Sequence, residues 1–338
     1  MTDSNLFEQQ AKNRRRSAWL TAGFVVFTAW VGFGGDLGIY LATKDAQEGY
    51  RHVVPIIGLV LSLLAGTIAW RSWAHGAEQV LRAAAASELV EPATPEQARL
   101  VNVVEEMAIA SGLPKPRVWI VPDSDPNAFA TGKDPTSAHV AVTEGLLATL
   151  DRDELQGVVA HEMAHIRNYD IRLMTLLAAM IGAILIASDL MRNFIRYGGR
   201  LGRPGSSRGG GKKGGNPLAL VVLGIWLLTL IVAPLVTRLL AMSVSRKREF
   251  LADATGAQFT RNPMALASAL EKLEAAVGAT RSIAKGAAHM CIVDPGQRVL
   301  GGKAGFRGLG SHPPISERLA RLRAMSFLPN RSPAVLSE

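Results

Sequence analysis

Apolar residues gather in four long runs along this chain, and polar segments separate them. The first run covers residues 18–42 and the second covers residues 53–70. As helices, both runs have about the length needed to cross the roughly 30 Å hydrocarbon core of a bilayer. The pattern predicts a transmembrane hairpin over residues 18–73, and a hairpin buried within a soluble protein is the alternative.

Two further apolar runs, residues 173–188 and 218–236, come later in the chain. A glycine-rich basic linker, residues 198–216, joins them, although positive loops usually stay on the cytoplasmic side. The pair, residues 173–236 in all, therefore spans the membrane against this rule, dips into it as a hairpin, or packs on the rest of the chain. We favour spanning, and we favour a solvated flexible linker over an RNA-binding one.

The polar segments predict a smaller set of helices and strands. Thr94 followed by proline is typical of a helix start, and the helix is expected to cover residues 95–111. Short apolar stretches predict strands at residues 117–121 and 139–143. The segment between them, residues 123–135, is rich in Asp, Asn, Gly and Pro and is expected to be a loop.

A second helix start is predicted where Asp151 and Glu154 can form a capping box. The helix that they open carries the candidate chemistry described below. Together these elements predict a mainly α fold with a small β-sheet, combined with transmembrane helices. The remaining helices are expected at residues 234–259, 263–277 and 315–324.

The charge of the chain, +9 at pH 7 with 48% hydrophobic residues, favours a membrane partner. Lys12 and residues 14–16 precede the first apolar run, and Arg71 and Arg82 follow the second. By the positive-inside rule, residues 1–17 and everything after Arg71 lie in the cytoplasm. We therefore expect the lipid bilayer, and not nucleic acid, as the partner, in the cell inner (plasma) membrane.

An HExxH sequence, formed by His161, Glu162 and His165, lies inside the helix that Asp151 opens. Residues four apart share one helical face, so both imidazoles can bind a single zinc ion. Glu162 is then placed as general base, to take a proton from a water molecule that the zinc ion acidifies. Cys291 is the only cysteine, which excludes a multi-cysteine zinc site. A surface helix with incidental histidines is the alternative.

A catalytic zinc ion needs a third protein ligand and an open position. The metzincin pattern requires Gly at position 168 and His at position 171, but the chain has Asn168 and Ile171. Glu249 and Asp253 form an ExxxD pair on one face of a later helix. Glu249 is expected to bind the metal, and Asp253 to accept the second N–H of His161. An exposed carboxylate pair that offsets basic neighbours is the alternative.

Three more motifs accompany these residues: NAFATG at residues 127–132, VAVTEGLL at residues 140–147 and SHPPISERL at residues 311–319. With the HExxH and ExxxD sequences and the two-plus-two apolar runs, the chain resembles the HtpX-type membrane metalloproteases, which are related to the CAAX-prenyl endoproteases. The match covers most of the chain. The long basic linker departs from it, and four spans at most disfavour the chamber of the CAAX-type enzymes.

The resemblance implies a gluzincin-like zinc metalloprotease domain in two parts, residues 74–172 and 237–338, that faces the cytoplasm. It implies one zinc ion per chain. It also implies ATP-independent endoproteolysis of membrane or misfolded proteins, in protein quality control or the stress response.

The resemblance further implies roles outside the zinc site. His312 would donate a hydrogen bond to the oxyanion that develops at the scissile carbonyl, and a histidine that only shapes a helix entry is the alternative. An extended substrate would pair as an extra strand along residues 139–143. The implied substrate-binding residues are Asn127, Val140, Val142 and Arg318.

Two other functional classes compete with a protease. A non-catalytic zinc-binding membrane scaffold or sensor would need the open coordination position blocked, and the sequence offers no fourth ligand of obvious spacing. A transporter would need opposite charges paired inside the apolar runs. Asp36 and Asp189 are the only candidates, and both are acidic, so the runs hold no opposite charge to pair with either.

Overall fold

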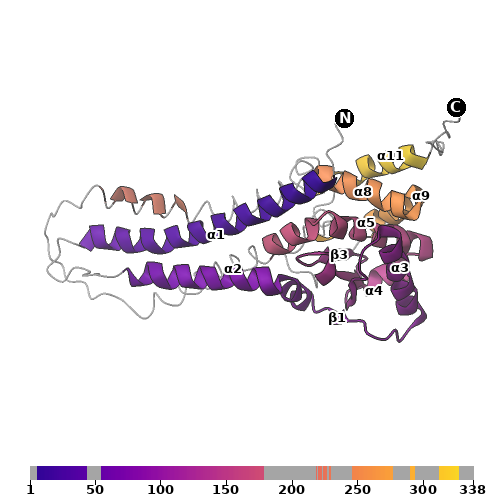
Figure 1. Cartoon of the computed structure of the whole chain (residues 1–338), viewed down its shortest axis with the longest axis horizontal. Helices are drawn as coiled ribbons and strands as arrows, with labels where there is room; N and C mark the ends of the chain where they lie inside the picture. The colour runs from indigo at the N-terminus through magenta and orange to yellow at the C-terminus, as the bar shows by residue number, and fades with distance from the viewer. Residues whose placement is uncertain are drawn as a thin grey trace, which may run out of the picture.

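The fold is that of a computed structural model, in which two long helices extend from a body of helices around a small sheet (Figure 1). The predicted linker, residues 198–216, lies outside the residues that the structure describes. The described residues are 6–43, 55–178, several positions between 218 and 229, 246–276, 290–293 and 312–326.

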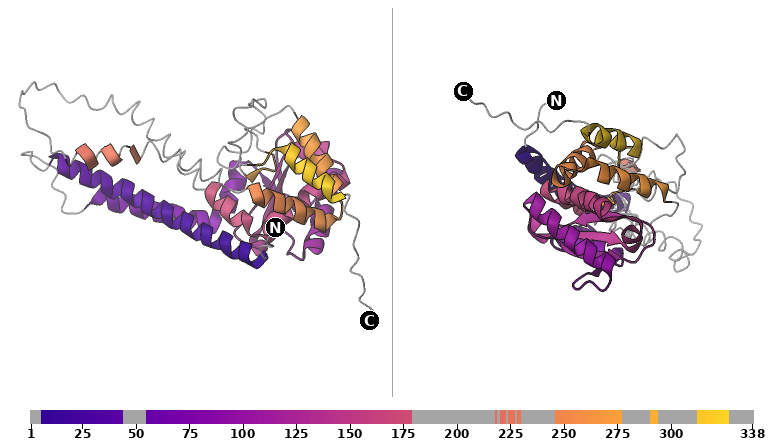
Figure 2. Two further views of the ribbon diagram at one scale, coloured as in Figure 1. Left: turned by 90° about the horizontal axis from the view of Figure 1, so that it is seen from above. Right: turned by 90° about the vertical axis from the view of Figure 1, so that its right-hand side faces the viewer.

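The two long helices are α1 (Leu6–Thr43) and α2 (Ile56–Ala83), and they run side by side (Figures 1 and 2). Asp36 of α1 is buried, and its Oδ2 accepts a hydrogen bond of 2.6 Å from the Gly58 N–H of α2. His75 has a non-helical φ of −130°, so α2 kinks there. Within the described residues, no helix combines the length and the apolar composition that crossing a membrane requires.

Four short strands form a mixed sheet in the order β1-β2-β4-β3. β2 (Arg117–Val121) and β4 (His139–Thr143) are parallel neighbours at its centre and confirm the two predicted strands. β1 (Ser87–Glu88) and β3 (Ala128–Thr131) pair antiparallel on the outer sides. β4 therefore has a partner on both sides, and β3 forms the edge of the sheet.

β3 corrects the prediction of a continuous loop over residues 123–135. All four of its residues are buried. Asn127 N–H donates to Thr143 Oγ1 at 2.8 Å, and Thr143 N–H donates to the Asn127 carbonyl at 3.0 Å, so the start of β3 is fixed to β4. Tertiary pairing forms this strand among turn-forming residues, and local composition does not report such pairing. A 3₁₀ turn, Pro135–Ser137, leads into β4.

The first helix of the body, α3 (Pro95–Ser111), has the predicted bounds. Thr94 Oγ1 accepts a 3.3 Å hydrogen bond from the main chain of the third helical residue. Gly112 ends the helix in the left-handed region, with a φ of +68°, which glycine adopts without steric cost. The predicted start signal is therefore present, and Gly112 supplies the stop.

The helix with the HExxH sequence is α5 (Arg152–Arg167), and it follows the short α4 (Glu144–Thr149). Asp151 Oδ1 accepts from the Glu154 N–H at 3.0 Å, and Glu154 Oε2 accepts from the Asp151 N–H at 2.9 Å. This capping box confirms the predicted helix start. Residues 157–166 are all buried, so α5 runs through the interior of the body.

Three helices follow in the second half of the described chain: α8 (Arg246–Thr260), α9 (Pro263–Ala275) and α11 (Ile315–Ser326). All three were expected, and α9 ends two residues before the predicted end. The predicted first part of the α8 segment, residues 234–245, lies outside the described residues.

α5 lies at the centre of the body, between the sheet with α3 on one side and α8 with α9 on the other (Figure 2). Two glycines allow the close approach. A Cβ at Gly157 of α5 would lie 2.8 Å from the main-chain nitrogen of Leu266 in α9. A Cβ at Gly256 of α8 would lie 3.0 Å from the main-chain nitrogen of His161 in α5. The chain is thus mainly helical with a small mixed sheet, and α8 comes within main-chain contact of α5 beside the HExxH sequence.

Candidate active site

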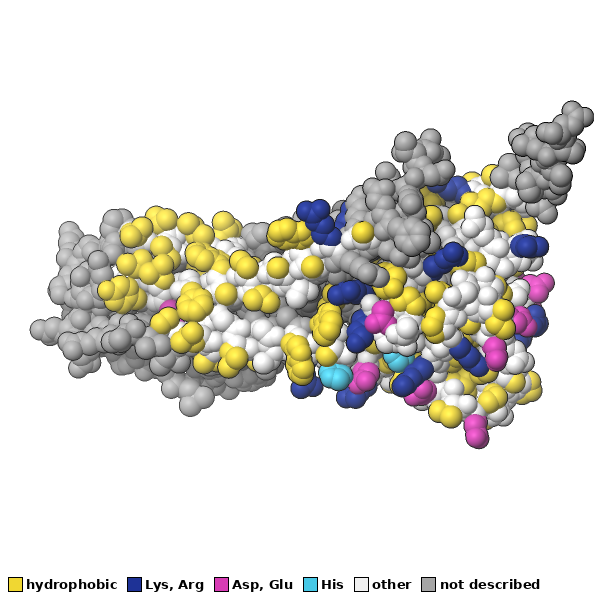
Figure 3. All heavy atoms as spheres, in the orientation of Figure 1, with side chains coloured by type: hydrophobic (Ala, Val, Ile, Leu, Met, Phe, Trp, Pro, Cys, Tyr) yellow, Lys and Arg dark blue, Asp and Glu magenta, His cyan; other side chains and the backbone are white. Residues whose placement is uncertain are grey.

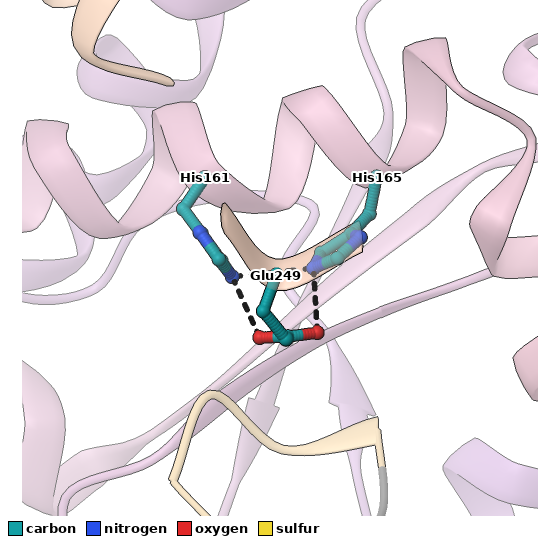
Figure 4. A group of neighbouring side chains, drawn as sticks. All are labelled: His161, His165 and Glu249. Atoms are coloured by element: carbon teal, nitrogen blue, oxygen red, sulfur yellow. Dashed lines mark hydrogen bonds and ion pairs between the residues drawn. The ribbon is translucent and has the colours of Figure 1, made fainter. Parts of the chain in front are cut away.

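Three side chains converge where α5 faces α8. His161 and His165 point from successive turns of α5 toward Glu249 of α8 (Figure 4). The two Nε2 atoms lie 3.2 Å apart, and they lie 3.7 Å and 3.6 Å from the two carboxylate oxygens of Glu249. One ligand atom from each residue falls within 4.8 Å of the others. Two imidazole nitrogens and a carboxylate oxygen at this spacing form a donor set suited to a zinc-like cation.

A carboxylate lies behind each of the two imidazoles. Asp253, one turn after Glu249, has its Oδ1 2.9 Å from His161 Nδ1, as the ExxxD spacing predicts. Asp170 has its Oδ2 3.1 Å from His165 Nδ1. These contacts leave both Nε2 atoms facing Glu249, because each ring's other nitrogen is turned to an acid.

Asp170 is a residue that the sequence patterns did not identify. α5 ends at Arg167, Tyr169 follows with a positive φ of 57°, and a new helical segment begins at Asp170. This sharp turn brings Asp170 back to His165. Because a metal-binding histidine usually has an acceptor on its second nitrogen, a search for an acid beside each histidine of the HExxH sequence could have found it.

Burial and charge set the protonation of these groups. Burial favours neutral His165, but the hydrogen bond with Asp170 and the charge of Glu249 prevail and raise the pKa of His165 to about 9. Burial also opposes ionisation of Asp253, yet the charge of Arg318 and the contact with His161 lower its pKa to about 2. Asp253 therefore remains charged at neutral pH.

Glu162 lies next to His161, and it lines a small cavity together with His161, His165 and Glu249. Its carboxyl group is fully buried and accepts a hydrogen bond from the Ala130 main chain of β3, and burial raises its pKa. A raised pKa makes the carboxylate a stronger base, which is what a general base requires.

His312 lies on the other side of Glu249. Its Nδ1 is 2.9 Å from Glu249 Oε2, and the side chain is buried. Burial alone would raise the pKa of Glu249, but the charge of His312 and its hydrogen bond hold that pKa well below the usual range. His312 Nε2 has no hydrogen-bond partner among the described residues.

The structure corrects the predicted role of Arg318. The side chain is 1% exposed, and its guanidinium holds Asp253 through two hydrogen bonds of 2.9 and 2.7 Å. Its Nη1 donates to the Ile292 carbonyl at 3.1 Å. Because these contacts use the guanidinium inside the body, Arg318 supports the acid behind His161 and does not face a substrate.

The predicted substrate strand is corrected as well. Val140 and Val142 are fully buried, and β4 is paired on both sides, so no further strand can add to it. Asn127 is also fully buried, and its Nδ2 donates to the Val293 carbonyl at 3.0 Å. The edge beside the site belongs to β3, whose Ala130 lines the cavity.

A short segment, residues 290–293, covers part of that edge and was not expected. Ile292 N–H donates to the Ala128 carbonyl of β3 at 3.0 Å. Met290, Cys291 and Ile292 line the cavity with His161 and its neighbours. The cavity has about 10 Å³ of space, roughly enough for one water molecule. No sequence signal marks this segment, because the hydrogen bonds that hold it join it to distant residues, namely Asn127, Ala128 and Arg318.

The class of protein follows from this site. A metallopeptidase has two histidines on one helical face, a glutamate from a second helix and a buried carboxyl group in the sequence between the two histidines. Comparison with known proteins gives the same class. The family model for peptidase family M48 matches residues 94–326. The chain belongs to peptidase family M48 and is a metalloendopeptidase.

Curated relatives match nearly the whole chain. The protease HtpX homolog of Thermoanaerobacter pseudethanolicus is 38% identical over 328 residues, which is 97% of this chain and 100% of the relative. The protease HtpX homolog of Streptococcus gordonii is 38% identical over 323 residues, 95% of this chain and 100% of the relative. The resemblance inferred from the motifs is confirmed.

A solved structure, that of Ste24p from S. mikatae, is also similar. It is 18% identical, has a TM-score of 0.41, and the match covers 90% of this chain and 66% of Ste24p.

Proposed function

We propose that this chain is a membrane-bound, zinc-dependent endopeptidase that cleaves peptide bonds of membrane or misfolded proteins in quality control or stress response. The observation that carries this proposal is the convergence of His161, His165 and Glu249 beside the buried carboxyl group of Glu162. The family supports the reaction class, and the geometry supports the residues.

Zinc fits this donor set better than a hard cation does. Mg²⁺ and Ca²⁺ prefer oxygen ligands, whereas His161 and His165 offer imidazole nitrogens and Glu249 one carboxylate. When bound, a zinc ion supplies Lewis acidity, which makes water a nucleophile near neutral pH and polarises a carbonyl group. A donor set of three leaves a position open for such chemistry.

Glu162 is the residue that moves the proton in this proposal. Its carboxylate takes a proton from the attacking water molecule and then passes that proton to the leaving amine nitrogen. The raised pKa suits the first step, because it makes the Glu162 carboxylate a stronger base toward the attacking water molecule. The N–H of Ala130 holds the carboxylate in place.

His312 is proposed as the donor to the oxyanion that develops at the scissile carbonyl. It lines the cavity, and its Nε2 has no hydrogen-bond partner among the described residues. A donor that is already positioned before reaction stabilises the developing charge with little reorganisation. The contact of Nδ1 with Glu249 fixes the ring, and an imidazolium ring donates from both of its nitrogens.

An extended substrate is proposed to lie along the edge strand β3, in place of the internal β4. β3 passes the site at Ala130, and main-chain pairing at an edge accepts many sequences. Ile292 of the 290–293 segment already donates a main-chain hydrogen bond to Ala128 on this edge. Substrate entry therefore requires this segment to move or limits the pairing to the end of β3 near Ala130.

The membrane attachment is supported by where large apolar side chains are exposed. Most of them lie on α1, α2 and the described positions of residues 218–228, and few lie on the body. Figure 3 shows hydrophobic side chains along the paired helices, whereas most charged side chains lie on the body. Trp19 is 68% exposed and Leu63 is 72% exposed. Extended apolar surfaces of this kind are costly in water and favourable in lipid. We propose a multi-pass protein of the inner membrane with the body in the cytoplasm.

The test is hydrolysis of casein by the purified full chain and its Glu162→Gln variant. We expect the variant to retain its zinc and to lose about 10²–10⁴-fold in rate. Glu144→Gln, which changes an exposed carboxylate at the start of α4, is the matched control and should keep the wild-type rate. Wild-type hydrolysis by Glu162→Gln contradicts the mechanism, and a zinc-loaded wild-type protein without turnover supports a scaffold or sensor instead.

A further inference from the structure

A second and much larger cavity lies where the end of α2 meets the body. It has a volume of about 350 Å³, within the range of ligand sites. Its walls come from α2 after residue 71, from β2 and the turn after β3, and from the helical segment that begins at Asp170. None of its lining residues lines the active-site cavity.

The cavity is strongly basic. Lys115, Arg117, Lys133 and Arg172 line it, and Glu78 is the one acid among its lining residues. Figure 3 shows basic and histidine side chains gathered where the paired helices meet the body. Four cations around one hollow repel one another, so an anion bound there would be stabilised by several of them at once.

Carboxylates elsewhere offset only part of this charge. Lys115 lies 3.0 Å from Glu105, and Arg117 lies 3.9 Å from Glu88 in an exposed pair. Glu78 itself lies 3.3 Å from Arg82. Surface pairs of this kind are weak and leave the cations available to another anion.

Lys133 and Arg172 have no carboxylate within 4 Å among the residues that the structure describes. The contact recorded for Lys133 is with Trp73, whose ring centre lies 5.3 Å from Nζ. Arg172 is half-buried, and its Nε is buried without a hydrogen-bond partner in the described part of the chain. An arginine donor left in this state lacks the acceptor that buried N–H groups normally have.

The place of the cavity in the fold indicates the source of the anion. Trp70 and Trp73 are 64% and 43% exposed, at the end of the apolar part of α2, and His75 kinks the helix directly after them. Tryptophan is enriched at the level of lipid headgroups. Trp73 and His75 themselves line the basic cavity.

We propose that this cavity binds the phosphate headgroup of an anionic membrane lipid, with Lys133 and Arg172 as its main ligands. The guanidinium of Arg172 offers paired donors to phosphate oxygens, and the ammonium of Lys133 adds a point charge. Basic pockets beside membrane helices have the chemistry for such headgroups. This inference rests on the proposed membrane attachment.

The experiment measures lipid binding to the purified full chain in detergent by native mass spectrometry. Phosphatidylglycerol is compared with phosphatidylcholine, and inorganic phosphate and glycerol phosphate are added as soluble competitors. We expect wild-type protein to retain phosphatidylglycerol at least tenfold better than phosphatidylcholine, with millimolar phosphate competing weakly.

The double variant Lys133→Ala, Arg172→Ala should lose most of that preference. The control Arg152→Ala, Arg323→Ala removes two exposed arginines that line no part of the cavity and should keep it. Lys133→Gln alone, at an exposed side chain, should weaken binding with little risk to folding. Equal phosphatidylglycerol retention by wild type and the double variant overturns the proposal, and soluble phosphate binding without a lipid preference overturns the assignment to lipid.

A carbonate wash of membranes that carry the wild-type protein separates the two proposals. Release of the protein by the wash would refute the membrane attachment itself. A protein that stays in the membrane but shows no phosphatidylglycerol preference would refute the headgroup site alone.

Discussion

Each of the two imidazoles in the proposed metal site contacts a carboxylate, and a basic side chain lies against that carboxylate. Arg318 holds Asp253, and Asp253 contacts His161. Asp170 contacts His165, and the guanidinium of Arg248 lies 3.5 Å from the carboxylate of Asp170. A charged group behind each imidazole fixes the orientation of the ring and its protonated nitrogen.

Arg318→Met tests whether this arginine is structural. The variant leaves Asp253 buried without its main partner, and loss of one member of a buried pair costs about 3–5 kcal/mol. We expect a lower free energy of unfolding and weaker zinc binding, measured by denaturant unfolding and chelator competition. Arg323→Met breaks an exposed pair with Glu271 and should cost about 0–1 kcal/mol. A raised KM with unchanged stability would instead support a role in substrate binding.

His139 predicts a pH dependence of stability. Burial and the charge of Arg117 lower its pKa, against the weaker effects of Glu88 and Glu78, and its Nδ1 accepts a 3.0 Å hydrogen bond from Trp119. Below about pH 6.5 the unfolded chain binds a proton that the folded chain does not. This contribution to stability is therefore complete above pH 6.5 and is lost as the pH falls toward the folded pKa.

The measurement for His139 is the free energy of unfolding at pH 7.5, 6.5 and 5.5 in wild type and in His139→Asn. Below pH 6.5 the free energy of unfolding should fall more steeply in the wild type than in the variant. The two slopes should differ by up to about 1.4 kcal/mol per pH unit. Equal slopes for the two proteins would show that His139 is not the group responsible.

At the scale of helices and strands, the close approach of α8 to α5 positions the third ligand. Gly256→Ala places a Cβ 3.0 Å from the His161 main-chain nitrogen, so α8 must move and carry Glu249 with it. Overpacking of this kind costs about 1–3 kcal/mol. We expect weaker zinc binding, measured by chelator competition, although Gly256 donates nothing to a metal.

Gly66→Ala is the matched control for the helix packing. No heavy atom lies within 4 Å of a Cβ at Gly66, and alanine favours a helix over glycine by up to about 1 kcal/mol. Zinc affinity should be unchanged in this variant. An unchanged zinc affinity in Gly256→Ala would mean that helix spacing does not set the position of Glu249.

The elements that the sequence predicts well are those with local signals. Capping residues defined the starts of α3 and α5, and the four-residue spacing placed His161 and His165 on one face. β3 and the segment 290–293 were not predicted because residues distant in the sequence hold them in place. Thr143 bonds the start of β3, and Ala128 and Arg318 bond the segment. The buried position of Arg318 likewise depends on how α8 and α11 pack.

At the scale of the whole molecule, a polar body is separate from the two apolar helices α1 and α2. Single-tryptophan variants test this in vesicles of brominated lipid, which quench fluorescence at short range. Trp30 on α1 is 39% exposed among other apolar residues and should be quenched. Trp119 of β2 packs in the body beside His139 and should be quenched far less. Equal quenching of Trp30 and Trp119 would contradict the division.

In the proposed function, the imidazoles of His161 and His165 and the carboxylate of Glu249 hold one zinc ion. Zinc K-edge X-ray absorption of the purified full chain, with metal content measured on the same sample, tests it most directly. We predict one zinc ion per chain, with nitrogen and oxygen neighbours at about 2.0–2.2 Å and no sulfur, and a changed spectrum for Glu249→Gln. A sulfur neighbour at about 2.3 Å, which Cys291 would supply, or no stoichiometric zinc would contradict it.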